Sequence, residues 1–203
     1  MDDFNIKIEY KHVPRFDSGS DESIDYLERE GYVIIKNALT ANEASKTLDL
    51  LWDYLENLGT GIDRANPMTW SDDKWPTCAH GGIIPSYGIG HSEAQWFVRG
   101  VPNVKKAFAK VWGTNDLLTS FDGVSLWRPW NIDPSWKTQS GQAWFHIDQH
   151  PISKPGKQCI QGLINLLPTS KEIGGNVVIP KSHNFFKDLP QEYKERVERL
   201  PLD

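Results

Sequence analysis

The chain has 203 residues, 38% of them hydrophobic and 24% charged, and its formal net charge is -5 at pH 7. This length suffices for one sizeable core, so we expect a single domain over residues 1–203. The acidic balance, without a clustered basic face, argues against nucleic acid as a partner. No apolar run approaches the roughly 18 residues of a membrane span.

The cysteine and tryptophan content narrows the class of protein further. Only two cysteines occur, Cys78 and Cys159, fewer than a small secreted domain held by disulfides would carry. The N-terminus is acidic and polar and lacks the layout of a signal peptide, so we expect a cytoplasmic protein. Nine tryptophans, several near glycine or proline, are typical of pocket walls around a small molecule, although filling of the core explains any single one equally well.

The first part of the chain predicts two helices with a strand between them. Residues 1–20 are expected to be a loosely ordered lead-in, followed by a helix that ends at Gly31 and a strand over residues 32–36. Thr40 and Glu43 have the spacing of a capping box. Apolar residues then recur at helical spacing until a glycine ends the run, which predicts the longer of the two helices.

The next segment, residues 60–100, is crowded with glycine, proline and tryptophan. It is too long for a simple connector in a compact domain, and such segments commonly cover a site. We therefore expect it to cover the site of this protein. Pro102 opens a further helix with one apolar side, which Gly113 ends.

The apolar pattern then changes to a period of two, which predicts four strands in one run. Pro190 begins a short C-terminal helix. Helices followed by antiparallel strands indicate an α+β fold of barrel-like layout, not alternating βαβ units. The predicted strands cover residues 117–128, 142–148, 158–167 and 175–180.

The stretch "QAWFHIDQHP" contains two side chains that could bind a metal ion. Because successive side chains of a strand point to opposite faces, His146 and Asp148 share one face and can converge on one point. An imidazole and a carboxylate at this spacing provide two corners of the 2-His-1-carboxylate triad, which holds Fe(II) and leaves positions open for oxygen and a cosubstrate. We predict His146 and Asp148 as metal ligands.

Other histidines fit a metal site less well. The motif His91-Ser92-Glu93 has the same form, but it lies in the glycine-rich segment without strand alternation, so His91 is expected to be a loop or helix-capping residue. His150 precedes a proline that ends strand pairing. Cys78 and His80 would provide only half of a zinc site, so a loop is favoured there.

Two polar side chains are predicted to bind a cosubstrate. Arg128 shares a strand face with Asp122 and Val124 and could hold a carboxylate by two parallel hydrogen bonds. A solvated arginine at the strand end is the competing interpretation. Asn165 interrupts an apolar run and could hydrogen-bond the cosubstrate, with a hydrogen-bonded buried amide as the equal alternative.

Two motifs together resemble a known family. "HID", followed after one strand by "GGNVVIPKSH", resembles the H-x-D and N-G-x-L-x-x-x-P-G-S-H signatures of the phytanoyl-CoA dioxygenase-like family of Fe(II)/2-oxoglutarate oxygenases. The N-terminal "LEREGYVIIKNALTANEA" is similar to that family's opening of a helix, a strand and a capped helix. The resemblance runs from about Ile24 to His183, and residues 60–100 are poorly accounted for.

The resemblance implies a double-stranded β-helix, jelly-roll or cupin-like, with N-terminal helices packed on the sheet. It also implies that His146 and Asp148 bind Fe(II), that 2-oxoglutarate and O₂ bind beside the metal, and that a small or lipid-like organic substrate is hydroxylated. A non-catalytic binding or scaffold module with the same fold is the alternative. A cupin-type metalloenzyme of another reaction class is a weaker one, because its usual cluster of histidines is lacking.

The family's third metal ligand, a histidine on a later strand, and the arginine beyond it that pairs with 2-oxoglutarate have no match after His183. Three interpretations stay open. The chain is a piece of a longer enzyme with a barrel incomplete at the C-terminus, which we favour because missing strands expose sheet edges. Alternatively His183, which otherwise caps a turn, is the third ligand, or the protein has kept the fold and lost the chemistry.

Overall fold

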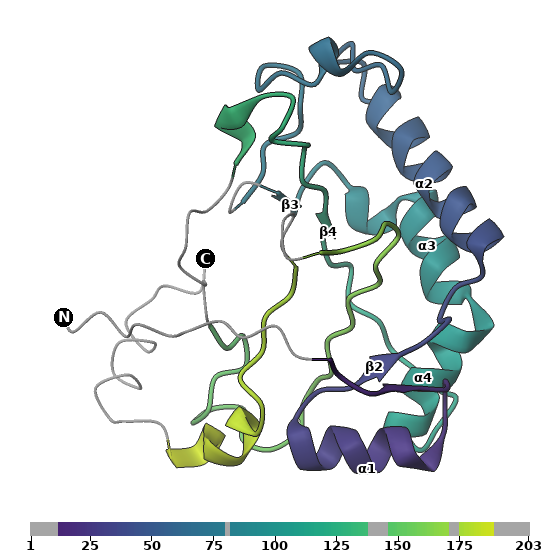
Figure 1. Ribbon diagram of the computed structural model, residues 1–203. Coiled ribbons are helices and arrows are strands. Elements are labelled where there is room, and N and C mark those ends of the chain that lie inside the picture. Colours follow the sequence, from purple (N-terminus) through teal and green to yellow (C-terminus); the bar gives the residue numbers. More distant parts are fainter. Residues whose placement is uncertain (1–11, 80–81, 138–145, 171–174, 189–203) are drawn as a thin grey trace. The chain divides into compact units, whose positions relative to one another are not determined.

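Figure 1 shows the computed structural model of the protein, which describes residues 12–79, 82–137, 146–170 and 175–188. The chain forms two compact units. The terminal unit comprises Met1–Lys36 and Ala143–Asp203, and the central unit comprises Asn37–Gln142. Each unit has its own helices and strands, and the single domain expected from the sequence stays a prediction.

Helix packing organises the central unit. Helix α2 (Ala41–Glu56) packs against α3 (Glu93–Gly100), and α4 (Pro102–Trp112) follows directly after α3 (Figure 1). The capping box predicted for α2 is confirmed: the Thr40 hydroxyl accepts from the Glu43 amide at 3.2 Å, and the Glu43 carboxylate accepts from the Thr40 amide at 2.7 Å. None of the helices in the described ranges has both the length and the apolar composition of a membrane span.

Helix α3 lies within residues 60–100, where the sequence predicted a covering segment and no helix. The Ser92 hydroxyl caps α3 by accepting from the Gln95 amide at 3.3 Å. His91 lies in the short 3-10 turn before this cap, in agreement with its prediction as a loop residue, and its ring stacks on Phe121 with 4.0 Å between the ring centroids. With only 8 residues, α3 is too short for its apolar period to stand out beside so many glycines. The helix predicted from Pro102 is confirmed as α4.

The core of the central unit lies where α2 meets the segment that follows it. Leu55 of α2 is 2% exposed and Ile84 is fully buried. Strand β3 (Ile83–Ile84) pairs antiparallel with β4 (Val124–Ser125), so residues beyond α4 return to this core. Full burial of one such side chain contributes about 1.5–3 kcal/mol. The buried cluster consists of Leu55, Ile62, Trp75, Ile84 and Ile89.

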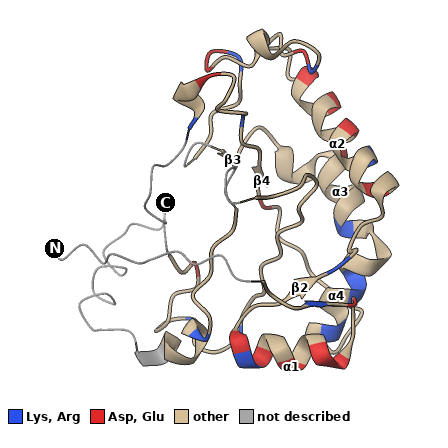
Figure 2. Ribbon diagram, viewed as in Figure 1, with Lys and Arg blue, Asp and Glu red and all other residues tan. Residues whose placement is uncertain are grey.

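Acidic side chains lie along α2 (Figure 2), and one arginine binds three of them. Arg64 lies 3.7 Å from a carboxylate oxygen of Asp49 and 2.8 Å from one of Glu56, and it also contacts Asp53. The hydrogen bonds from Arg64 hold the pKa of Glu56 below its usual value. These contacts fasten the chain that leaves α2 to the last two turns of the helix.

The terminal unit begins with two short parallel strands and the helix that connects them. Strand β1 (Arg15–Phe16) pairs with β2 (Ile34–Ile35), and α1 (Asp21–Glu30) lies between them in the chain (Figure 1). Helix α1 ends at Gly31, whose φ of 80° is the left-handed conformation that glycine adopts without steric cost. The predicted helix and its glycine end are confirmed, and β1 is an ordered part of the expected lead-in.

The strands predicted later in the chain are mostly not strands in the structure. Residues 158–167 and 175–180 take part in no strand pair among the described residues, and the strand predicted over residues 117–128 is present only as β4. Strand backbone needs a neighbour to bond its N–H and C=O groups. The double-stranded β-helix therefore stays a prediction. Residues 142–145 and the helix predicted from Pro190 lie outside the described residues.

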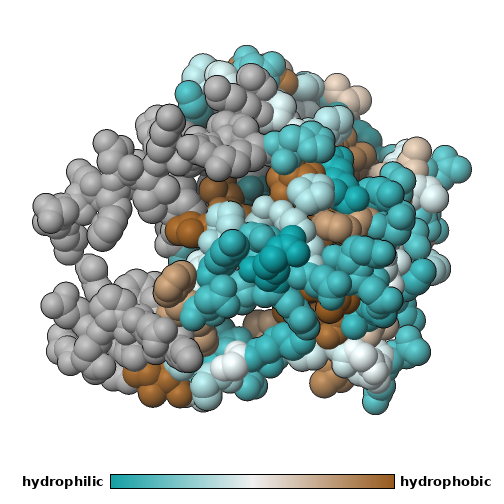
Figure 3. Space-filling model, turned by 60° about the horizontal axis from the view of Figure 1, so that its bottom comes forward, coloured by the Kyte–Doolittle hydropathy of each residue, from teal (hydrophilic) through white to brown (hydrophobic). Residues whose placement is uncertain are grey.

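Large apolar side chains are exposed along these same segments. Leu163 is 55% exposed, Leu167 is 64% exposed and Ile179 is 47% exposed. Figure 3 shows apolar residues at the surface of the described residues as separate patches between hydrophilic ones. Sheet formation would bury one face of each segment. Because these segments are not paired among the described residues, their apolar side chains are exposed.

Substitution of Thr40 by alanine tests the capping box of α2. We expect Thr40→Ala to lower the free energy of unfolding by about 1 kcal/mol, because the hydrogen bonds of the Thr40 hydroxyl with the amide and the carboxylate of Glu43 are lost. Urea denaturation followed by far-UV circular dichroism measures the change. Ser45→Ala, at an exposed position of the same helix, is the control and should change stability by less than about 0.5 kcal/mol. Equal effects of both substitutions would contradict the role of the cap.

Candidate functional site

The two predicted metal ligands lie side by side in the terminal unit. The Nε2 atom of His146 is 3.3 Å from Oδ1 of Asp148. The side chains are 43% and 53% exposed, so both are open to a ligand from solution. Residues 146–148 form no strand in the structure, so the strand alternation from which the convergence was predicted is not present there. The two side chains nevertheless lie close together, and their binding of one metal ion stays a prediction.

A hydrogen-bonded loop follows the pair. The Gln149 amide donates to the carbonyls of Lys154 and Gly156, each at 2.5 Å. The Nδ1 atom of His150 accepts from the amides of Ile152 and Ser153 at 3.3 and 3.0 Å. This ring nitrogen therefore supports the backbone of the loop.

A residue from beyond the loop binds the second oxygen of the aspartate. The side-chain amide of Gln161 donates a short hydrogen bond to Oδ2 of Asp148. Oδ1 of Asp148 thus faces His146, while Oδ2 accepts the hydrogen bond from the Gln161 amide. Gln161 was not predicted as a site residue, although it interrupts the same apolar run as Asn165.

The His146–Asp148 pair fits two neighbouring positions of an octahedral metal site. Ligand bonds of about 2.0–2.2 Å at right angles place two donor atoms about 3 Å apart. The measured separation of 3.3 Å between nitrogen and oxygen is close to that value. Within the described ranges no third His, Cys, Asp or Glu completes a group that could hold a metal ion. Two side chains that could belong to a 2-His-1-carboxylate triad thus lie together in the described ranges, and their binding of a metal ion stays a prediction.

His183 contacts helix α1 of the same unit. Its Nε2 atom lies 2.9 Å from the carbonyl oxygen of Glu28, in the last turn of α1. The Lys181 amide donates to the carbonyl of Glu30 at 2.8 Å. Helix ends leave carbonyl groups without intrahelical donors, and this segment supplies two of the missing donors. His183 thus caps the end of α1, whereas the sequence predicted that it caps the turn after residues 175–180, and its role as a metal ligand stays a prediction.

The ring of His183 also occupies the space next to Gly31. A Cβ atom at position 31 would overlap the imidazole, so glycine is required there by packing as well as by its φ of 80°. Lys181 itself has a φ of 65°, a left-handed conformation that is costly for a residue with a side chain. It occupies the position at which the P-G-S-H signature has glycine.

Arg128, predicted to bind 2-oxoglutarate, lies in the central unit among tryptophans. Its guanidinium donates to the Trp70 carbonyl and to the Asp72 carboxylate, both at 2.6 Å. The guanidinium carbon lies 4.6 Å from the ring centroid of Trp136 and 5.6 Å from that of Trp75. The side chain is 12% exposed. Arg128 thereby links residues 70–75 to Trp136, and its role toward a cosubstrate stays a prediction.

The remaining candidates are simpler. Asn165 is exposed in the terminal unit, so its predicted contact with the cosubstrate also stays a prediction. Cys78 is partly buried and its thiol donates to the Pro76 carbonyl at 3.1 Å, and burial raises its pKa. His80 lies outside the described residues.

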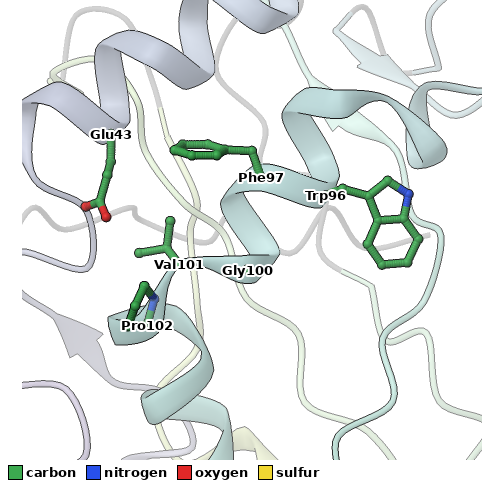
Figure 4. A pocket seen from close by; sticks show the side chains of 6 residues that line it. All are labelled: Glu43, Trp96, Phe97, Gly100, Val101 and Pro102. Carbon is green, nitrogen blue, oxygen red and sulfur yellow. The ribbon is translucent and has the colours of Figure 1, made fainter.

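One open pocket of about 290 Å³ lies where α2, α3 and α4 meet (Figure 4). Phe97, Val101 and Pro102 give it apolar walls, and Trp96 and Phe97 leave α3 in opposite directions. Its carboxylate, Glu43, already accepts from Thr40 in the capping box. The pocket contains no second polar side chain with which chemistry could be done, so it is not the candidate site.

Comparison with known proteins gives two relatives. The chain is 33% identical over 197 residues to "Ava biosynthesis cluster protein O" of Aspergillus versicolor, covering 97% of the chain and 61% of the relative. It is 26% identical over 200 residues to a "Putative phytanoyl-CoA dioxygenase" of Dictyostelium discoideum, covering 81% of the chain and 56% of the relative. The chain thus spans less than two thirds of the length of either relative. No family model and no solved structure matches it. The second relative suggests a dioxygenase family.

Alanine at position 31 tests the contact between Gly31 and His183. We expect Gly31→Ala to lower the free energy of unfolding by about 2–3 kcal/mol, since it adds a steric clash to the strain of a left-handed backbone. In a His183→Ala background only the strain remains, so the loss should shrink by at least about 0.5 kcal/mol. Chemical denaturation measures both changes.

Gly113→Ala is the matched control for this cycle. Gly113 has a φ of 66°, and no atom lies within 4 Å of the position that its Cβ would occupy. Its substitution should cost about 1 kcal/mol, independent of residue 183. Additive effects of Gly31→Ala and His183→Ala would show that the two residues do not touch.

Replacement of Arg128 by lysine separates its two possible roles. Lysine cannot donate to two acceptors in the planar arrangement of a guanidinium or stack on Trp136 in the same way. We expect Arg128→Lys to lower the free energy of unfolding by about 1–2 kcal/mol and to change tryptophan fluorescence. Arg29→Lys, at a side chain that is 58% exposed, is the control and should have little effect. Unchanged stability with weakened 2-oxoglutarate binding would instead support a role in cosubstrate binding.

Proposed function

We propose that this chain contributes the metal site of an Fe(II)- and 2-oxoglutarate-dependent dioxygenase that hydroxylates a small or lipid-like organic molecule. The observation that carries the proposal is the approach of His146 Nε2 to Asp148 Oδ1 at 3.3 Å. Similarity to a relative named as a phytanoyl-CoA dioxygenase supports the same reaction class.

The two side chains would have distinct tasks in such a site. Fe(II) with 2-oxoglutarate and O₂ supplies the oxidising power to hydroxylate an unactivated C–H bond. His146 offers a neutral nitrogen donor, and Asp148 offers one negative charge that offsets part of the charge of the ion. Because both side chains are about half exposed, an ion held between them would also be reachable by a cosubstrate from solution.

We also propose the double-stranded β-helix as the fold around this site. The support comes from residues 158–167 and 175–180, which have strand-like sequences and expose large apolar side chains such as Leu167 and Val178. Pairing with further strands would cover those side chains and provide hydrogen bonds to the backbone of both segments. Asn165, the proposed contact for the cosubstrate, lies in the first of these segments.

The name of the Aspergillus relative supports the substrate class. That protein is named for a biosynthesis cluster, which favours a small organic molecule as the substrate of a related chain. The alternative proposal is a binding or scaffold module without catalysis. It draws support from the described residues, which offer two ligands and no third.

Anaerobic titration of the full chain with Fe(II) and 2-oxoglutarate tests the proposal. We expect a weak visible charge-transfer band from the chelate, and more than about 100-fold weaker Fe(II) binding after His146→Ala or Asp148→Ala, because first ligands are removed. The chain offers matched controls in the similar motif of the central unit. His91→Ala and Glu93→Ala should leave Fe(II) binding unchanged.

Two results would separate the alternatives. Fe(II) binding with decarboxylation of 2-oxoglutarate to succinate supports the oxygenase. A folded chain that binds neither Fe(II) nor 2-oxoglutarate supports the binding module.

A further inference from the structure

We propose that Gln161 is a positioning residue that fixes how Asp148 binds the metal ion. This inference rests on the proposed function, because it concerns the same site. Its starting point is the different surroundings of the two Asp148 oxygens: Oδ1 is 3.3 Å from His146 Nε2, whereas Oδ2 accepts a short hydrogen bond from the Gln161 side chain.

The two oxygens of a free carboxylate are equivalent, so the group can bind a metal ion through one oxygen or through both. Asp148 is 53% exposed, and neighbouring water offers no fixed orientation. The hydrogen bond from Gln161 removes that freedom. The Gln161 amide occupies Oδ2, and Oδ1 faces His146. Asp148 would therefore bind the metal ion through Oδ1 alone.

Binding through one oxygen has a chemical consequence. A carboxylate that binds through both oxygens takes two of the six positions around an octahedral ion, whereas Asp148 held by Gln161 takes one. A chelating cosubstrate and an oxygen molecule both need open positions. Gln161 would therefore keep available a position that Asp148 could otherwise close.

The amide is well suited to this task. Lysine or arginine at position 161 would also donate a hydrogen bond, but its positive charge would repel the metal ion and neutralise Asp148. The amide donates without a net charge, so the full negative charge of Asp148 remains for the ion. The amide must turn its nitrogen toward Asp148, because its oxygen would face a second acceptor.

Two other glutamines of the same region have different partners. Gln149 donates to the carbonyls of Lys154 and Gly156, and Gln158 donates to the carbonyl of Pro155 at 2.9 Å. Both support the backbone of the loop between Asp148 and Gln161. Gln158 is therefore a matched control: the same residue type, exposed in the same segment, with its amide bonded to backbone instead of to Asp148.

The test compares Gln161→Met with Gln158→Met in the full chain. Methionine has nearly the length of glutamine and donates no hydrogen bond. Co(II), which gives visible absorption bands that report its coordination, is the probe. We expect Gln161→Met to weaken Co(II) binding about 10-fold and to change the shape of the bands, because an orienting partner of a ligand is lost. Gln158→Met should change neither.

Gln161→Asn provides a second variant that keeps the amide on a shorter side chain. Its Co(II) affinity should lie between those of the native protein and Gln161→Met, which a merely structural role would not produce. Native affinity and native bands in Gln161→Met would overturn the inference. Asp148→Ala separates this failure from failure of the proposed function: unchanged Co(II) binding in Asp148→Ala overturns the metal site itself.

Discussion

The candidate site depends on the orientation of one carboxylate, that of Asp148, which two neighbouring side chains contact. Asp148 lies between an imidazole on one side and an amide on the other, and the two partners come from separate parts of the chain. A metal ligand works only when its free oxygen points at the ion. The loop between Asp148 and Gln161 matters for the same reason. Hydrogen bonds between its side chains and its backbone hold the loop in one conformation, which places Gln161 beside Asp148.

The central unit achieves its order by different means. Its core is a cluster of aliphatic and tryptophan side chains on α2 and the segment that follows, and Arg128 reaches into the same region from a later part of the chain. A guanidinium satisfies a carbonyl, a carboxylate and an aromatic face at once. Trp75 and Trp136 are buried in this region, whereas Trp96, Trp127 and Trp130 of the same unit are exposed, so both interpretations of the tryptophan content stay open.

Signals carried by neighbouring residues were readable from the sequence. Thr40 and Glu43 predicted the start of α2, Gly31 the end of α1, and the spacing of His146 and Asp148 their convergence. Contacts between distant segments left no such signal. Nothing beside Gln161 in the sequence indicates Asp148, and nothing beside His183 indicates α1. The strands predicted over residues 158–167 and 175–180 are not paired among the described residues, because an apolar period of two shows which face a strand would bury, while pairing depends on neighbours elsewhere in the chain.

The packing of His183 against Gly31 has a meaning for the evolution of this protein. A residue larger than glycine at position 31 could be accepted only together with a smaller side chain at position 183, since both compete for the same volume. The two positions should therefore change together in related sequences. Such covariation would show that packing couples the "PKSH" motif to the end of the first helix. It would arise even in a relative that had lost every metal ligand.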